Sequence, residues 1–420
     1  MTLENNAMSD PFGLQREALI RKSGVREIFT PHKPIHSLTL FFGRTLEVRA
    51  LIEHLNTPGQ HALLYGDRGV GKSSLANIAT ELLLEQLSSG KCFKKRCDST
   101  DNFKSILEEP LAEVGVNIRL IESERRKAEG GKAQVGIPGF GGDLHTTTGQ
   151  RSKERGLSSE LESPSWVASK LSRFDGLLLV DELDALRDTL DRHKIAELIK
   201  QLSDIGSPFK VFLVGIAETG ADLTDGHPSV ERCLRETRLG RMSDSELRQI
   251  IDEGERALGL RFTPEAKQRI VSVSSGYPHF THLLALKAAE DAIAERRTEI
   301  GITSVEAATR RAVDDSEGRL KRQYDEACRS YGTDEYHHIV CAAAVLGSEE
   351  FTAAQLRDEY ESLWGRKIDQ NSLNNYFNRL VSEGDQTILR RLAKGVYRFN
   401  DPRMPSFVRI SNMAVMNVER

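Results

Sequence analysis

The chain has 420 residues, of which 39% are hydrophobic and 29% charged, and its 58 basic and 62 acidic residues give a formal net charge of −4. This composition is typical of a globular protein with room for two or three domains, and it excludes nucleic-acid binding through overall positive charge. The five cysteines are odd in number and scattered, which excludes a disulfide framework, makes a zinc site improbable and favours reduced thiols.

Residues 1–37 form a polar leader in which residues 14–20 are amphipathic and predict a surface helix. The first residues lack the basic and apolar regions of a signal peptide, and the longest apolar run, residues 339–347, is too short to span a bilayer. We therefore expect a cytoplasmic protein. A helix is predicted from Thr45 to Leu55, with Leu46, Leu51 and Leu55 buried.

Residues 66–73, GDRGVGKS, fit the phosphate-binding P-loop pattern, between an apolar strand at 61–65 and a helical pattern at 74–84. Glycines let backbone N–H groups surround a phosphate, and the helix N-terminus adds a positive dipole end. Lys72 can reach the β- and γ-phosphates, and the Ser73 hydroxyl can bind Mg²⁺. We therefore predict an ATP–Mg²⁺ site with contacts from Gly66, Asp67, Arg68, Gly69, Val70, Gly71, Lys72, Ser73 and Ser74.

The next elements alternate between strands and helices. A strand is predicted at 91–98, a helix at 103–116 with a break or kink near Pro110, a helix at 194–202 and a strand at 210–216. A Gly-rich insert at about 122–165 interrupts them, and the sequence leaves open whether it is disordered or a small hairpin. The alternation predicts an α/β fold with a parallel sheet covered by helices.

A second diagnostic strand begins at Gly176 and ends in Asp181 and Glu182. Ligands bind at the carboxyl ends of strands in such sheets. We therefore expect Asp181 to hold the Mg²⁺ shell and Glu182 to act as the general base that polarises the attacking water. The alternative is that Asp181 and Glu182 belong to an exposed acidic loop after a core strand and have no catalytic role.

From residue 241 the pattern is helical only, and Ser243-Asp244-Ser245-Glu246 is a capping-box pattern that opens a helix at 247–258. From residue 336 the sequence predicts three helices, the second of which begins at Thr352, and a hairpin that turns at Lys394 and Gly395. Three helices and a hairpin describe a winged helix. We divide the chain into a leader (1–37), a P-loop domain (38–240), an all-α lid (241–315), a linker helix (316–335), a winged-helix domain (336–410) and a tail (411–420).

These residues and their order resemble AAA+ ATPases of the origin-recognition and initiator clade, and the Gly276-Tyr277-Pro278 stretch resembles STAND switch ATPases. The resemblance implies that the lid closes over ATP, that Pro278 packs by the adenine, and that His279 stands where the family has a sensor arginine. It also implies a trans-acting arginine finger, Arg232, with Arg235 in reserve; the alternative is a surface arginine. The fourth strand ends in Ala217-Glu218-Thr219, which departs from the usual polar sensor.

The sequence leaves the ligand of the winged helix open between DNA and protein. Its asparagines at 371–378 and Arg379 can read base edges, and its hairpin arginines can bind phosphates. The basic residues that we assign to double-stranded DNA are Arg390, Arg391, Lys394 and Arg398.

The resemblance implies a slow ATPase that assembles as a homo-oligomer through Arg232 and regulates a DNA-associated process such as replication, transposition or mobile-element defence. The alternative is a STAND-type signalling switch whose winged helix docks a protein. A third hypothesis, a scaffold with an inactive site, conflicts with the intact Lys72, Ser73, Asp181 and Glu182.

Overall fold

A computed structural model describes residues 24–36, 38–86, 90–116, 118, 160–216, 228–315, 318–330, 332–381 and 387–412. The predicted helix at 14–20, most of the Gly-rich insert and the Ala217-Glu218-Thr219 stretch lie outside these residues. The chain divides into two compact units. The sheet unit holds Thr45–Asp67 and Lys72–Leu239; the helical unit holds Met1–Arg44, Arg68–Gly71 and Gly240–Arg420.

The sheet unit is built on five parallel strands in the order β2-β3-β4-β1-β5. In chain order they are β1 (His61–Gly66), β2 (Lys91–Arg96), β3 (Gly176–Asp181), β4 (Lys210–Gly215) and β5 (Leu234–Leu239). The central strands β1, β3 and β4 are buried along almost their whole length, as expected for a sheet covered on both faces. The predicted α/β fold is thus confirmed.

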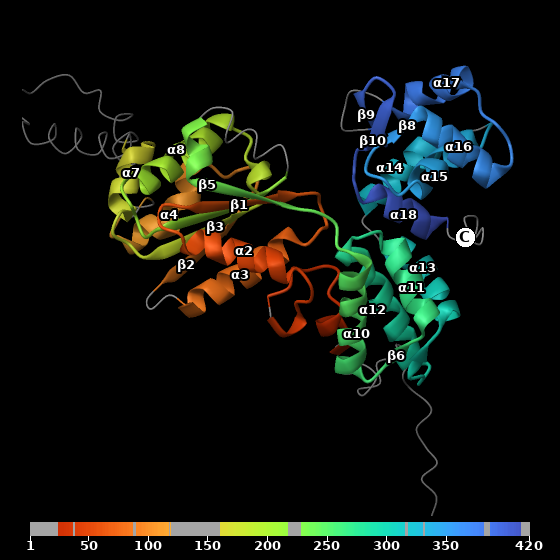
Figure 1. The fold of residues 1–420 in the computed structure, drawn as a ribbon, viewed down its shortest axis with the longest axis horizontal. Helices are drawn as coiled ribbons and strands as arrows, with labels where there is room; N and C mark the ends of the chain where they lie inside the picture. The colour runs from red at the N-terminus through yellow and green to blue at the C-terminus, as the bar shows by residue number, and fades with distance from the viewer. Residues whose placement is uncertain are drawn as a thin grey trace, which may run out of the picture. The chain divides into compact units, whose positions relative to one another are not determined.

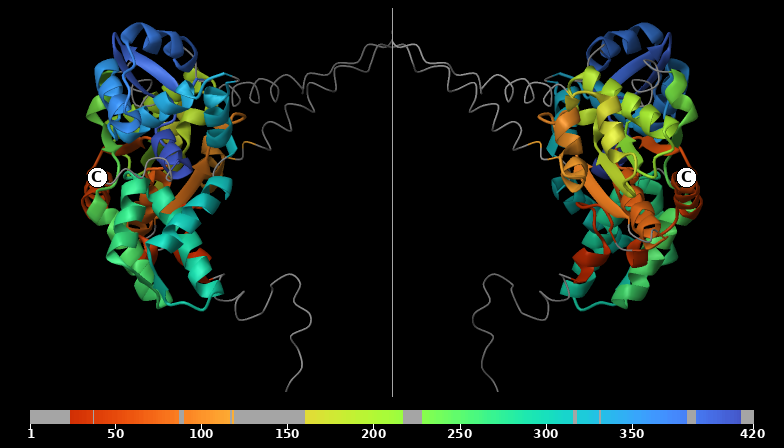
Figure 2. Two further views of the ribbon diagram at one scale, coloured as in Figure 1. Left: turned by 90° about the vertical axis from the view of Figure 1, so that its right-hand side faces the viewer. Right: turned by 90° about the vertical axis from the view of Figure 1, so that its left-hand side faces the viewer.

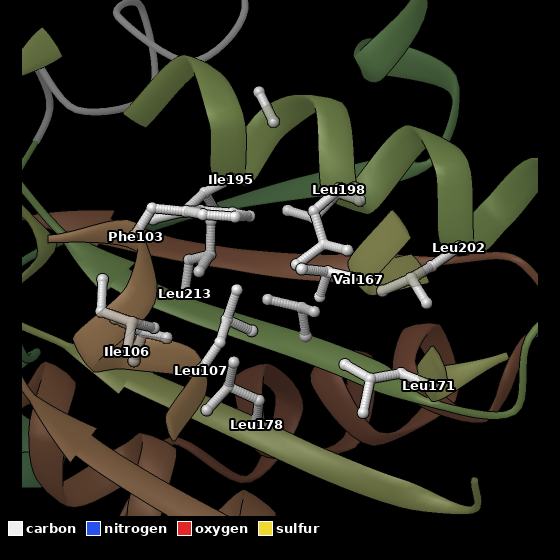
Figure 3. Packing of buried hydrophobic residues seen from close by; sticks show 14 of the residues in the cluster. Phe103, Ile106, Leu107, Val167, Leu171, Leu178, Ile195, Leu198, Leu202 and Leu213 are labelled. Atoms are coloured by element: carbon white, nitrogen blue, oxygen red, sulfur yellow. The ribbon is translucent and has the colours of Figure 1, made fainter. Parts of the chain in front are cut away.

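Helices cover both faces of this sheet (Figure 1). One face carries α2 (Thr45–Asn56) and α3 (Lys72–Gln86), and the other carries α4 (Phe103–Glu113), α7 (Pro164–Leu171) and α8 (Thr189–Asp204). Figure 3 shows the second face, where side chains of α4, α7 and α8 interdigitate with Leu178 of β3 and Leu213 of β4. This packing fixes the strands, and so fixes the positions at which they end.

Two local predictions about the sheet unit are wrong. The helix α4 continues through Pro110 to Glu113, because Pro110 lies on the buried face with Ile106 and Leu107, and core packing offsets the hydrogen bond that proline removes. Leu46 is 81% exposed. The buried face of α2 is formed by Val48, Leu51 and Leu55, and Leu46, five residues before Leu51, points about 140° away from it.

The helical unit contains two groups of elements (Figures 1 and 2). The first group is α10 (Asp244–Leu258), α11 (Pro264–Ser274), α12 (Pro278–Ala294) and α13 (Ile302–Asp315). The predicted capping box is present, since Ser243 accepts from the Glu246 N–H and Glu246 from the Ser243 N–H. Two short parallel strands that the sequence did not predict, β6 (Arg261–Phe262) and β7 (Glu299–Ile300), join this group.

The second group is the C-terminal region, which has the predicted order of three helices and a hairpin. It consists of α15 (Glu335–Val345), β8 (Phe351–Thr352), α16 (Ala353–Trp364), α17 (Gln370–Leu380), β9 (Leu389–Ala393) and β10 (Val396–Phe399). The helix α14 (Gly318–Cys328) precedes it and α18 (Met404–Ser411) follows it. The sequence did not predict α18, which packs against α11 and α13 as well as α14 and α15. Among the described helices, none has the length and apolar character needed to cross a membrane.

Candidate nucleotide-binding site

The P-loop connects the end of β1, at Gly66, to the start of α3, at Lys72. Gly66 leaves the strand at φ 154°, and a Cβ there would lie 2.3 Å from the carbonyl oxygen of Leu239 on the neighbouring strand β5. Only glycine fits this close approach. The loop therefore leaves the sheet at its carboxyl end and directs the first N–H groups of α3 toward the space above that end.

Lys72 is held at the base of this loop. Its ammonium donates to the carbonyl oxygens of Gly66, at 2.9 Å, and Asp67, at 2.8 Å. Ser73 and Ser74 follow in the first turn of α3. The charged group is thus fixed beside the loop that the sequence assigns to phosphate.

Asp181 ends β3 and Glu182 follows it directly. The strand β4 lies between β1 and β3, so the P-loop and the acidic pair are two strand spacings apart, about 10 Å, at the same edge of the sheet. Glu182 has a left-handed backbone, φ 56° and ψ 42°, and its N–H donates to Asp181 Oδ1 at 2.9 Å. The hydrogen bond and the left-handed turn together fix the backbone at the end of β3.

Arg96, which sequence reasoning did not single out, contacts Glu182. It is the last residue of β2 and lies opposite Asp181 in the sheet register. Its Nη2 donates to Glu182 Oε1 at 2.6 Å, and this hydrogen bond, together with the carboxylate charge, raises the pKa of Arg96. Both side chains are largely exposed, at 68% and 45%. A basic residue at the end of the strand before the acidic strand is the signal that could have identified it.

Arg232 lies at the opposite edge of the sheet from the P-loop. It ends the short helix η3 (Pro228–Arg232), two residues before Leu234, which pairs with His61 at the start of β1. The P-loop begins after Gly66, five residues further along β1, about 17 Å away. The side chain is exposed, and its guanidinium makes no hydrogen bond or ion pair with the described residues. Arg232 is therefore out of reach of the phosphate site of its own chain.

The tip of the P-loop, Arg68–Gly71, groups with the helical unit. Within that unit, a Cβ on Gly71 would lie 3.8 Å from Cγ of Pro278, the first residue of α12. A Cβ on Gly69 would lie 2.9 Å from Cδ of Arg403 and 3.7 Å from Cδ1 of Tyr277. Tyr277 belongs to the stretch that the sequence singled out, whereas Arg403 is a further neighbour of the loop that the sequence did not indicate.

His279 is engaged by the backbone of an earlier segment. Its Nδ1 lies 2.8 Å from the carbonyl oxygen of Pro31, and its ring packs edge-on against Phe280. Arg44 has a comparable structural environment, because its Nη2 donates to the Gly240 carbonyl and its N–H to Glu246. Both residues tie the segment before α2 to the first group of helices.

The basic side chains of the C-terminal region are partly occupied by internal contacts. Arg379 on α17 donates to the carbonyl oxygens of Glu326 and Arg329 and lies over the Tyr336 ring. On the hairpin, Arg391 donates to the Tyr397 hydroxyl. Arg390 and Arg398 face each other across β9 and β10, and Lys394 is exposed at the turn.

Comparison with known proteins gives a family and several distant structural likenesses. The family model described as Novel STAND NTPase 1 matches residues 34–347. No curated protein sequence matches.

Three of the solved structures with a similar arrangement illustrate how distant these likenesses are. One is a Walker-type ATPase of Pyrococcus abyssi, with 18% identity, TM-score 0.48 and coverage of 91% of this chain and 99% of that chain. Aeropyrum pernix ORC2 in ADPNP–ADP complexes has 16% identity, TM-score 0.48 and coverage of 93% and 97%. Aeropyrum pernix ORC1 in complex with DNA has 14% identity, TM-score 0.44 and the same coverage.

Likenesses at these identities and TM-scores say nothing about what this chain binds. The family match is different in kind, because it spans three quarters of the chain and includes the P-loop, the Asp181–Glu182 strand and the Gly276-Tyr277-Pro278 stretch. This chain belongs to the Novel STAND NTPase 1 family.

Proposed function

We propose that this protein is a slow ATPase that works as a nucleotide-controlled switch. The observation that carries the proposal is the juxtaposition of the P-loop with Asp181 and Glu182 at the carboxyl edge of one parallel sheet. A loop that binds phosphate and a carboxylate that polarises water are the two components that nucleotide hydrolysis needs there.

The residues divide the work as follows. Residues 66–74 bind the phosphates, with Lys72 leaving the Gly66 and Asp67 carbonyls for the β- and γ-phosphates. The hydroxyl of Ser73 and the carboxylate of Asp181 are oxygen donors that suit Mg²⁺, which supplies charge neutralisation on the phosphates. Glu182 orients water and takes its proton. Pro278 and His279 contact the nucleotide from the lid.

The ion pair with Arg96 supports slow turnover. A carboxylate oxygen that accepts a hydrogen bond from a guanidinium is less available to accept one from the attacking water. Because both groups are exposed, the pair is worth at most about 1 kcal/mol, which a bound nucleotide can overcome. The ion pair between Arg96 and Glu182 is thus suited to a switch, in which the rate of ATP hydrolysis depends on the conformational state of the protein.

Assembly through Arg232 completes the proposal. Its position at the edge opposite the P-loop is compatible with contact to a neighbour's γ-phosphate and incompatible with contact to its own. Such a finger contributes to the transition state only in the oligomer.

A second candidate function is control of a process on double-stranded DNA through a C-terminal winged helix. Four asparagines, Asn371, Asn374, Asn375 and Asn378, are exposed on α17, and Lys394 is exposed on the neighbouring hairpin. Amides can read base edges and cations can bind phosphates. Against this candidate, Arg379 is held by carbonyl oxygens of α14 and its C-terminal end, so it is not available to read guanine.

The test is size measurement by light scattering on Glu182→Gln with ADP and with ATP, and on the same variant carrying Arg232→Ala. We expect ATP-dependent oligomers that require Arg232, with unchanged ATP binding. Monomers in both nucleotide states, with ADP retained through purification, would favour a monomeric switch over assembly. Short duplex DNA at low and moderate salt, added to the same samples, tests the second candidate, because phosphate contacts weaken as salt rises.

A further inference from the structure

The helix α18 carries an arginine, Arg409, two of whose guanidinium nitrogens are enclosed. All its other residues except Ser411 are buried, and Ser406 donates to the Ser274 carbonyl. Part of the Arg409 side chain reaches the surface, but its Nε and Nη2 are enclosed and, within the part of the chain that the structure describes, have no hydrogen-bond partner. Enclosed charged groups normally have one, because enclosure removes their hydration.

A second arginine lies beside it. Arg241, just before α10, donates from Nη1 to the Gly347 carbonyl at 3.3 Å, and Arg409 Nη2 lies 4.0 Å from the position that a Cβ on Gly347 would take. Arg241 also donates from Nε to the Tyr277 hydroxyl at 3.0 Å, with its guanidinium over the Tyr277 ring. Two guanidinium groups therefore lie beside Gly347, and the Tyr277 phenol lies against one of them.

Negative charge in this cluster does not match the positive charge. Glu349 forms an ion pair with Arg241, but its side chain is 46% exposed and its Oε1 lies 3.9 Å from Arg241 Nε, which is too far for a hydrogen bond. Burial and the nearby Arg241 lower the pKa of Arg409 to about 10. The two cations thus destabilise each other in the absence of an anion between them.

We infer that Arg241 and Arg409 form an anion site that takes the phosphate group of a small molecule and thereby holds α10–α13 and the C-terminal region together. Guanidinium forks match the oxygens of phosphate, and two of them match its double charge. Duplex DNA is too wide to bring a phosphate to the enclosed Nε and Nη2 of Arg409. The site goes beyond the proposed ATPase, because neither arginine belongs to the P-loop.

The test uses the full chain with Lys72→Ala, so that the P-loop does not bind the probe. Inorganic phosphate and pyrophosphate are titrated while thermal unfolding and calorimetric binding are followed, with sodium chloride at equal ionic strength as the reference. Arg409→Met and Arg241→Met are compared with Arg256→Met, a control on α10 whose side chain is 72% exposed.

We expect phosphate to stabilise the Lys72→Ala protein and its Arg256→Met derivative, and the dissociation constant to rise at least tenfold in the Arg409→Met and Arg241→Met derivatives. In buffer without phosphate, Arg409→Met should unfold at the same or a higher temperature, because it removes an unpaired charge. A merely structural arginine would show a lower temperature at every phosphate concentration.

Four results would overturn the inference. The first is an equal response of Arg409→Met and its parent to phosphate, and the second is a response that chloride reproduces. The third is a loss of ATP affinity in Arg409→Met, with Lys72 intact, as large as its loss of phosphate affinity, because the arginines would then serve the P-loop nucleotide. The first two readouts do not depend on ATP binding, so failure of the ATPase proposal leaves them unaffected. The fourth is a duplex oligonucleotide that raises the unfolding temperature of the parent and not that of Arg409→Met. The site would then bind nucleic acid and not a small ligand.

Discussion

The carboxyl edge of the five-stranded sheet and the C-terminal region were both predicted to bind phosphates, and they differ in what holds the candidate groups. At the sheet edge, backbone geometry does so: Gly66 turns against Leu239, and Glu182 adopts a left-handed conformation. In the C-terminal region the candidates are long side chains, and Arg379 and Arg391 are bound to carbonyl and hydroxyl oxygens of their own chain. A sequence motif predicts a binding site well when the backbone holds the binding groups. A cluster of basic side chains predicts one only after their contacts within the protein are known.

Lys72→Ala gives the largest expected effect and tests the sheet edge. Loss of charge-assisted hydrogen bonds to two phosphates should weaken ATP binding about 100-fold, or about 2.7 kcal/mol. Calorimetric titration of ATP measures it, with Lys170→Ala, an exposed lysine on α7, as the control. Unchanged affinity would contradict the phosphate assignment and restore the scaffold hypothesis.

His61 allows a test of the stability of the sheet that does not involve the nucleotide site. It is buried at the start of β1, and its Nδ1 accepts from the Val211 N–H at 3.0 Å. Burial, with Lys210 nearby, lowers the pKa of His61 to about 3 from the usual 6.5. As pH falls below about 6.5, His61 is therefore protonated in the unfolded chain but not in the folded protein. The free energy of unfolding should fall by about 1.4 kcal/mol per pH unit, which amounts to about 2 kcal/mol at pH 5.

Denaturant unfolding between pH 7 and pH 5 measures this dependence. His61→Asn keeps an acceptor near the Val211 N–H and cannot titrate, so its slope should be smaller by about one proton. The matched control is His36→Asn, which removes an exposed histidine and should keep the parent slope. Equal slopes in His61→Asn and the parent would mean that other groups dominate the acid response.

Arg379→Met sharpens the comparison from the side of the C-terminal region. Because Arg379 caps the Glu326 and Arg329 carbonyls, its loss should lower the free energy of unfolding by about 1.5 kcal/mol and leave any DNA affinity unchanged. Denaturant unfolding and DNA titration measure the two quantities. The control is Lys394→Met at the exposed hairpin turn. If duplex DNA binds there, this variant should lose DNA affinity and keep the free energy of unfolding of the parent. A DNA affinity that depends on Arg379 would contradict the structural role.

Arg96→Met gives the smallest expected effect. Releasing Glu182 from an exposed ion pair worth at most about 1 kcal/mol should raise the ATP hydrolysis rate roughly threefold and no more than fivefold. Steady-state phosphate release measures it. Lys94→Met, two residues earlier on the same strand, is the control and should not change the rate. A slower Arg96→Met would mean that Arg96 contributes to the reaction and does not restrain Glu182.

The sequence by itself determined the elements whose signals are local. The P-loop follows a strand and opens α3, Asp181 ends β3, and the capping boxes at Ser243 and Thr352 begin helices where the pattern predicted them. Such signals act within one helical turn or along one strand, so a single stretch of chain specifies them. The same locality misplaced Leu46 and the break at Pro110, because burial and packing partners, which override propensity, come from distant segments.

Only the tertiary structure decided which side chains meet. The strand order puts β4 between the P-loop and the acidic pair, and β2 next to β3, which brings Arg96 to Glu182. In the helical unit, the tertiary structure brings Arg409 and Arg241, which are 168 positions apart, to the same glycine, Gly347. The physical reason is that long side chains find their partners through chain crossings, whose arrangement depends on the whole core, and no spacing along the sequence records it.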